Sequence, residues 1–156
     1  MAINRGKDFE QHIREAFEKV PGVSIDRLHD QTTGFKGSSN ICDFIVYKKP
    51  YEYYIECKSV HGGTLPFSNI TETQWNGLLE KSKINGVFAG IICWWIDKDA
   101  TFFIPIDALE IGKNYFNEKS VKLKDCYEDD IYIEIHGKKK RVFFDYDMED
   151  FLARCR

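Results

Sequence analysis

The stretch ICDFIVYKKPYEYYIECKS at residues 41–59 decides the fold that we expect for this chain. It holds two runs rich in aromatic and β-branched residues, 41–47 and 52–59, which are separated by a turn that contains Lys49-Pro50. Aromatic and β-branched side chains favour strands, and proline favours turns. The stretch therefore predicts a β-hairpin.

The turn sets the register of this hairpin and brings three charged residues together. With Lys49-Pro50 at its centre, Asp43 lies opposite Glu56, where side chains are about 5 Å apart. Side chains alternate between the two faces of a strand, so Glu56 and Lys58 share a face at a spacing of about 7 Å. Two carboxylates and one ammonium are therefore predicted to meet on one patch of the sheet.

The regions around the hairpin complete an α/β pattern. Apolar residues with helical spacing occupy residues 7–20 and stop at Pro21-Gly22. Further helices are predicted at 71–83, 107–117 and 148–155, strands at 23–28, 87–96 and 101–106, and a closing hairpin at 131–135 and 142–146. The run 87–96 is apolar almost throughout, as in a strand covered on both faces. We expect one α/β domain over residues 1–156, with a mixed central sheet flanked by helices.

The composition argues against several other classes of protein. A hydrophobic share of 43% is that of a packed globular chain. Five cysteines without any C-x-x-C argue against a zinc knuckle or a disulfide framework and favour a reducing cytosol. No signal peptide is recognisable, and no apolar run is long enough to cross a membrane. We expect a cytoplasmic protein with no membrane partner, although a net charge of −3 does not by itself indicate nucleic-acid binding.

The three charged residues of the hairpin suit phosphodiester hydrolysis. Two carboxylates and the backbone carbonyl of Cys57 can bind Mg²⁺ and leave several waters on the ion. Such an ion makes a bound water more acidic and neutralises charge on the phosphate. Lys58 can orient the attacking water or stabilise the added negative charge. Cross-strand charge pairing on a solvated face is the alternative interpretation of Asp43, Glu56 and Lys58.

Four motifs in this order resemble the RecU-type Holliday junction resolvases of the PD-(D/E)XK nuclease superfamily. They are NRGKDFE at 4–10, ICDF at 41–44, YIECKS at 54–59 and TETQWNGL at 71–78. The resemblance implies a restriction-endonuclease-like core. The proline that usually precedes the family's aspartate is absent, because Cys42 stands before Asp43. The loop 29–40 is also short beside the stalk of bacterial resolvases, so the chain is more similar to compact versions encoded by phages or mobile elements.

The resemblance also implies roles for five residues. Asp43 and Glu56 would be the principal metal ligands, and Lys58 would be the catalytic lysine. Glu10 would be the helix acid of the site, reaching a metal directly or through water, and Gln74 would position Lys58 or the phosphate. From the residues alone, Glu10 is equally a helix acid favoured by the dipole, and Gln74 is an ordinary surface residue.

The same resemblance implies Mg²⁺ or Mn²⁺ as cofactor and a homodimer that acts on branched DNA. The substrate would be the four-way junction of recombination and repair. The enzyme would lie in the cytoplasm, associated with the nucleoid, or in the host cytoplasm if it is phage-encoded.

Four basic residues are candidate contacts to the DNA backbone: Arg5, Lys7, Lys36 and Lys81. Arg5 and Lys7 stand at the first predicted helix and are equally a solvated start. Lys36 lies on a loop rich in glycine, serine and threonine. Lys81 is near a helix end, where cations are favoured whatever the function. The basic run 138–141 is either a DNA-contacting arm or a solubilising turn.

We therefore predict a metal-dependent, structure-selective DNA endonuclease that resolves Holliday junctions. Three alternatives stay open. A nuclease of the same fold could act on flaps, nicks or duplex sites, a module of this fold could bind DNA without catalysis, and the negative net charge permits a protein-interaction domain.

Overall fold

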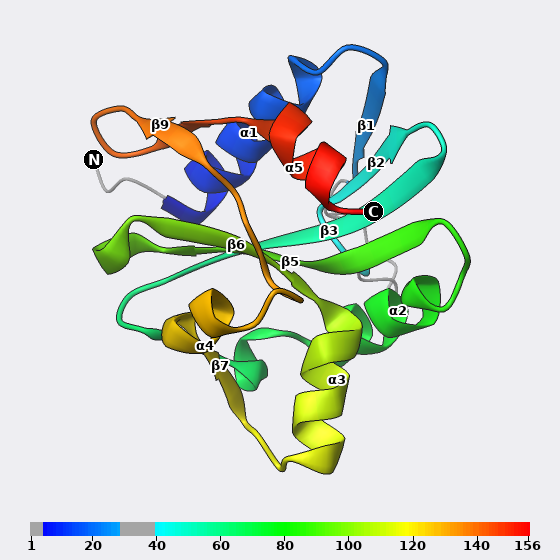
Figure 1. Cartoon of the computed structure of the whole chain (residues 1–156), viewed down its shortest axis with the longest axis vertical. Helices are drawn as coiled ribbons and strands as arrows, with labels where there is room; N and C mark the ends of the chain where they lie inside the picture. Colours follow the sequence, from blue (N-terminus) through cyan, green and yellow to red (C-terminus); the bar gives the residue numbers. More distant parts are fainter. Residues whose placement is uncertain (1–4, 29–39) are drawn as a thin grey trace, which may run out of the picture.

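A computed structural model of the chain describes residues 5–28 and 40–156. Its centre is a mixed six-stranded sheet with the strand order β1-β2-β3-β5-β6-β8 (Figure 1). The strands are β1 (Val23–Arg27), β2 (Phe44–Lys48), β3 (Tyr51–Val60), β5 (Val87–Trp95), β6 (Ala100–Pro105) and β8 (Ile133–Glu134). Strands β3 and β5 are parallel, and the other neighbours are antiparallel.

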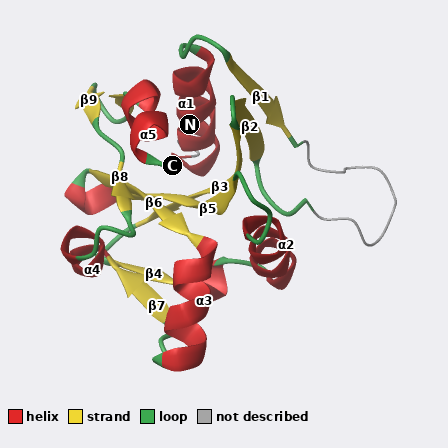
Figure 2. Cartoon of the chain, turned by 45° about the vertical axis from the view of Figure 1, so that its right-hand side comes forward, coloured by secondary structure: helices red, strands yellow, loops and turns green. Residues whose placement is uncertain are grey.

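Helices cover both faces of this sheet. One face carries α1 (Arg5–Glu18) and α5 (Met148–Arg154), and the other carries α2 (Glu72–Ser82), α3 (Ile106–Tyr115) and α4 (Leu123–Glu128) (Figures 1 and 2). Each face has its own hydrophobic cluster. The predicted α/β class, with a mixed central sheet flanked by helices, is confirmed.

Helix α1 forms because its apolar side chains recur at helical spacing. Phe9, Ile13 and Phe17 are all buried against the sheet, while the opposite side of the helix is polar. The chain then turns at Gly22, whose φ of 74° lies in the left-handed region that glycine adopts without strain. This turn leads directly into β1, which pairs with β2.

The β2–β3 hairpin has the register that the sequence predicts. Phe44 is paired with Ile55, so the preceding residue, Asp43, lies beside Glu56. Alternation along β3 places Glu56 and Lys58 on the face that α2 covers, whereas Ile55 packs toward α1. The charged residues therefore lie on the α2 side of the sheet.

Strand β5 is buried on both faces, as its apolar sequence predicts. Every residue from Ala89 to Trp95 is buried. Trp94 belongs to the cluster beneath α1, and Trp95 belongs to the cluster beneath α2 and α3. The parallel pairing of β3 and β5 thus lies deep inside the domain, which anchors the strand that carries Glu56.

The C-terminal part differs from the predicted closing hairpin. Ile133–Glu134 pairs with β6, and the hairpin is instead made by β9 (Gly137–Lys139) and β10 (Phe144–Tyr146). The turn lies later than predicted, since Lys140 N–H donates to the carbonyl of Phe143 over 2.8 Å. Two short strands, β4 (Thr64–Pro66) and β7 (Ser120–Lys122), and helix α4 were not predicted at all.

Two further features bear on the predictions. The loop that carries Lys36 lies outside the described residues. Within residues 5–28 and 40–156, no helix has the length and apolar character that a membrane crossing requires.

Candidate active site

Asp43 directly precedes β2, with its side chain directed at β3. Its backbone N–H donates to the carbonyl of Ile55 over 3.0 Å, which continues the hairpin by one residue beyond the paired strand. Its Oδ2 accepts a hydrogen bond of 2.8 Å from the backbone N–H of Cys57. The carboxylate is therefore held by the backbone of β3, directly beside Glu56.

Glu56 is a buried carboxylate with two donors on one oxygen. Only 5% of the residue is exposed. Its Oε2 accepts from Lys58 Nζ and from Gln74 Nε2, both at 3.0 Å. We call Asp43, Glu56, Lys58 and Gln74 the acidic centre. The hairpin register predicted that Asp43, Glu56 and Lys58 would meet, the family resemblance added Gln74, and the structure brings the four residues together.

Gln74 reaches Glu56 because of the way α2 begins. Thr71 is the N-cap, and its hydroxyl accepts from the N–H of Gln74 over 3.2 Å. The Gln74 side chain accepts in return from the N–H of Thr71 over 3.1 Å, which completes a capping box. The amide nitrogen of Gln74 remains for Glu56, so one side chain both caps the helix and contacts the site.

Helix α2 also approaches the chain just before Asp43 very closely. A Cβ built on Gly77 would overlap the side chain of Ile41. Glycine at this position therefore lets α2 pack close enough to the sheet for Gln74 to contact Glu56.

The two carboxylates of the acidic centre resist ionisation. Burial raises the pKa of Asp43 most, and the charge of Glu56 raises it further. Burial likewise raises the pKa of Glu56, against the opposing effect of Lys58. The charge of Glu10 raises both pKa values. Two ionised carboxylates beside one ammonium would leave a net negative charge in this half-buried site, so the pair holds on to a proton unless a bound cation compensates the charge.

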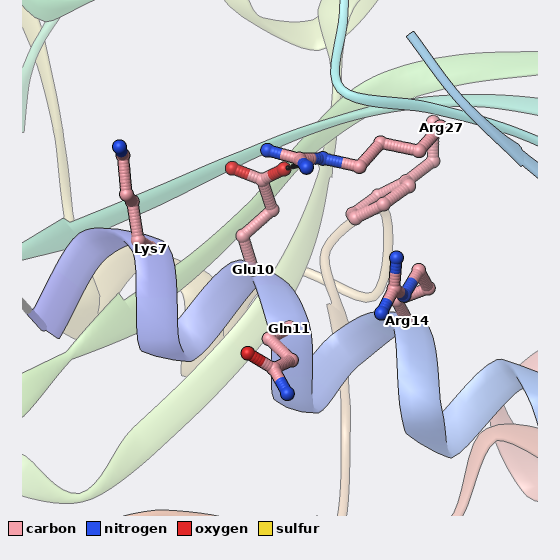
Figure 3. A pocket seen from close by; sticks show the side chains of 6 residues that line it. Lys7, Glu10, Gln11, Arg14 and Arg27 are labelled. Atoms are coloured by element: carbon pink, nitrogen blue, oxygen red, sulfur yellow. Dashed lines mark hydrogen bonds and ion pairs between the residues drawn. The ribbon is translucent and has the colours of Figure 1, made fainter. Parts of the chain in front are cut away.

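Glu10 has a different partner from the one that the family resemblance implies. Its Oε1 accepts from Arg27 Nε over 2.8 Å, and Figure 3 shows the two side chains turned toward each other. Among the described residues, no group of three or more acidic, histidine or cysteine side chains is arranged to hold a metal ion. Glu10 is therefore near enough to the acidic centre for its charge to affect both carboxylates, but its side chain is bound to Arg27 of β1.

The remaining oxygen donors still fit a hard cation. The N–H and carbonyl of one strand residue point to the same edge, so the carbonyl of Cys57 faces the edge at which its N–H meets Asp43. Asp43, Glu56 and this carbonyl supply oxygen ligands from two adjacent strands, a set that suits Mg²⁺ or Mn²⁺ when waters complete the coordination.

Three of the four basic residues that are candidate DNA contacts, Arg5, Lys7 and Lys81, lie on helices. Arg5 and Lys7 lie on the exposed first turns of α1. Lys81 on α2 lies 5.2 Å from the centre of the Tyr54 ring, a side chain on the same face of β3 as Glu56. In the basic run, Lys139 is paired with Asp99 and lies over Phe144, so it belongs to the folded β9–β10 hairpin.

Sequence reasoning missed Arg27, Arg14 and Thr71. Arg27 and Glu10 are 17 positions apart in different elements, and no local spacing signals their contact. For Thr71 a signal existed, because a threonine followed three residues later by glutamine is the pattern of a capping box.

No protein-family model matches the chain, and no curated protein sequence matches it. Among solved structures, the chain is similar to Hjc, a Holliday junction resolvase from the archaeal hyperthermophile Archaeoglobus fulgidus. The TM-score is 0.48 at 19% identity, over 65% of this chain and 78% of that chain. A similarity of this size does not establish a function.

Proposed function

We propose that this chain is a metal-dependent DNA endonuclease of the restriction-endonuclease-like type, and that it resolves four-way junctions as a homodimer. The observation that carries the proposal is the acidic centre: Glu56 is buried on β3, Asp43 lies beside it directly before β2, and Lys58 and Gln74 are both 3.0 Å from Glu56. Isolated surface pairing would leave such groups exposed and one carboxylate to each ammonium, whereas Glu56 is buried and the centre has two carboxylates for one ammonium.

Each residue has a distinct part in this proposal. Asp43, Glu56 and the Cys57 carbonyl would hold Mg²⁺ or Mn²⁺. When bound, the cation supplies Lewis-acid stabilisation of the phosphate and a more acidic water. Lys58, with 20% of its side chain exposed, can place its ammonium against a phosphate oxygen or the attacking water while Glu56 orients it. Gln74 holds Glu56 in place.

The preference for four-way junctions and the homodimer rest on the sequence motifs alone. A symmetric dimer would present two acidic centres to opposite strands of a junction, and paired cuts at symmetric positions would be its signature.

The deciding experiment is cleavage of synthetic DNA by the purified chain with Mg²⁺, with Mn²⁺ and with EDTA. The substrates are a four-way junction, a flap, a nicked duplex and a linear duplex of the same sequence. We expect metal-dependent, paired cuts in the junction and loss of cutting in Asp43→Asn. Equal cutting of linear duplex would assign a different nuclease substrate. Binding without cutting under every condition would indicate a non-catalytic DNA-binding module.

A further inference from the structure

A groove with three lysines lies at α4 and β7, outside the four sequence motifs (Figure 1). It encloses about 350 Å³ and is formed by three segments of the chain. These are residues 63–64 after β3, Lys98 at the end of the short 3₁₀ helix Ile96–Lys98, and residues 122–124 together with Tyr127. We call it the lysine groove.

The lysine groove and the acidic centre lie on the same side of the sheet. Leu123 in the groove and Leu78 of α2 are buried in one hydrophobic cluster, on the face that α2 covers. Strand β3 leads from one site toward the other, since Lys58 stands five positions before Gly63. Their Cα atoms are therefore at most about 17 Å apart. This is the length of about five base pairs of duplex DNA, so one DNA molecule can reach both sites.

Backbone hydrogen bonds hold the walls of the lysine groove in place. The N–H of Leu123 donates to the carbonyl of Gly63 over 2.9 Å. The N–H of Gly62 donates to Oδ2 of Asp97 over 2.6 Å, which ties the loop after β3 to the segment that carries Lys98. Because Leu123 is buried, the lysines that stand directly before and after it are both exposed. The cations are thus presented from a fixed frame.

The lysine groove is lined by cations and apolar surface, and no carboxylate is among its lining residues. None of its three lysines forms an ion pair with another described side chain. The pKa of Asp97 is lowered by hydrogen bonds from residues 61–62 and further by the charge of Lys98, so Lys98 has one carboxylate nearby. Asp125 and Glu128 of α4 do not line the groove. Although the chain has a net charge of −3, this surface is therefore locally positive and fits a polyanion.

Tyr127 adds an aromatic surface to the lysine groove. The residue is 58% exposed, and its ring is held at right angles to Phe102, with the ring centres 5.0 Å apart. Proteins bind single-stranded nucleic acid with this combination, because cations follow the phosphates while a base stacks on an aromatic ring. The bases of an intact duplex are stacked on one another, so a duplex would use the lysines alone.

We propose that the lysine groove binds an unpaired strand of a branched DNA, with its phosphates on Lys98, Lys122 and Lys124 and a base on Tyr127. The inference rests on the proposed nuclease function and narrows its substrate to branched DNA with an unpaired stretch near the cut. The groove holds this strand while the adjoining duplex lies at the acidic centre. Its residues bind the substrate and take no part in the chemistry.

The first test measures binding of a labelled oligothymidine in EDTA by fluorescence anisotropy over a range of salt concentrations. Each contact to a single-strand phosphate adds about 0.7 to the slope of log affinity against log salt concentration. We expect Lys122→Gln/Lys124→Gln to lower the slope by about 1.4. Lys49→Gln/Lys83→Gln removes the same charge at the other end of β3 and β5 and should leave the slope unchanged. Equal slopes in these two variants would overturn the proposal.

A charge-conserving variant separates loss of charge from misfolding. Lys122→Arg/Lys124→Arg keeps both cations and should retain the wild-type slope. A slope lowered as far by arginine as by glutamine would mean that the lysines act through the fold, which overturns their contact with phosphates.

The second test concerns the stacked base. Tyr127→Ala should weaken oligothymidine binding by about tenfold with an unchanged salt slope, whereas Tyr127→Phe should bind as the wild type does. Binding of a blunt duplex should not respond to either change. Equal binding of oligothymidine by the two variants, or an equal loss with the duplex, would overturn the unpaired strand as the ligand.

Cleavage of a flapped substrate separates this inference from the nuclease proposal. Lys122→Gln/Lys124→Gln should raise KM several-fold and leave kcat unchanged, because the groove binds and does not react. Cleavage by the wild type, with oligothymidine binding unaffected by any variant, overturns the groove and leaves the nuclease standing. The expected binding changes without cleavage under any metal condition keep the groove and overturn the nuclease.

Discussion

The acidic centre and the pocket between α1 and β1, lined by Lys7, Glu10, Gln11, Arg14, Arg27 and Phe44, are two charged regions that differ in how their charges are paired. The acidic centre has two carboxylates whose pKa values are raised chiefly by burial, because removal from water disfavours the charged form. In the pocket between α1 and β1, Arg27 Nε lies 2.8 Å from Glu10 Oε1, and Arg14 Nε lies 3.7 Å from Glu18 Oε1, so each arginine has a carboxylate partner. Charge is thus paired between α1 and β1, whereas at the acidic centre a bound cation would stabilise the ionised form of the carboxylates.

The exposed ion pairs of the surface differ from the acidic centre. Lys19 and Asp145 are both exposed and neutralise each other at 2.8 Å. Such pairs contribute little to stability and leave no charge uncompensated. The acidic centre instead holds two carboxylates beside one ammonium, which favours a ligand of positive charge.

The largest effect is expected from removing the ammonium of the acidic centre. Lys58→Ala should lower the rate of junction cleavage by about a thousandfold, because general acid–base or electrostatic help of this kind is worth roughly 10²–10⁴. Binding of junction and of Mn²⁺ should persist, since the carboxylates and the other cations of the protein remain. Cleavage at the wild-type rate would show that the assigned mechanism is wrong.

A smaller effect is expected from forcing α2 away from the acidic centre. Gly77→Ala places a methyl group against Ile41, and overpacking of this kind costs about 1–3 kcal/mol. The free energy of unfolding, measured by urea titration, should fall, and cleavage should weaken because Gln74 moves from Glu56. Gly63→Ala is the control, since a Cβ there meets no atom within 4 Å. Equal stability of the two variants would contradict the close packing.

The smallest effect concerns the pH dependence of stability. The folded-state pKa of Asp43 is raised, so the folded protein binds more protons than the unfolded chain, and stability is lost as pH rises through that pKa. Asp43→Asn removes the ionising group while its amide oxygen can still accept from Cys57. In EDTA we expect this variant to be more stable than the wild type by about 1 kcal/mol near pH 8, seen as a higher melting temperature.

The same comparison has a low-pH and a metal control. Below about pH 4, where the carboxyl is protonated in both states, the stability gain of Asp43→Asn should disappear. Mg²⁺ should raise the melting temperature of the wild type near pH 8 and not that of the variant. A variant that is less stable than the wild type at every pH would indicate a structural ion pair in place of a metal site.

The hairpin and its register could be read from the sequence because the information is local. The aromatic and β-branched runs, together with Lys49-Pro50, fix both strands and the turn, and these alone place Asp43 beside Glu56. The apolar stripe of α1 and the continuous apolar run of β5 are equally local signals, and both elements form where they were expected.

The parts that were not predicted depend on contacts between distant segments. Ile133 pairs with Phe103 at the edge of the main sheet, and this competing partner moves the C-terminal hairpin along the chain. The ion pair of Glu10 with Arg27 and the unsatisfied nitrogen of Arg14 are likewise invisible to spacing rules, because they arise from the packing of α1 beside β1.

The double duty of Gln74 constrains how this site can vary. Its oxygen is used by Thr71 and its nitrogen by Glu56, so the amide cannot be flipped without losing both bonds. Glutamate would serve equally well in the capping box, but it would add a third carboxylate to Asp43 and Glu56 in the acidic centre. Substitution at position 74 is thus restricted by two independent requirements. The start of α2 needs the side-chain oxygen for its capping box, and Glu56 on β3 needs the side-chain nitrogen as a donor.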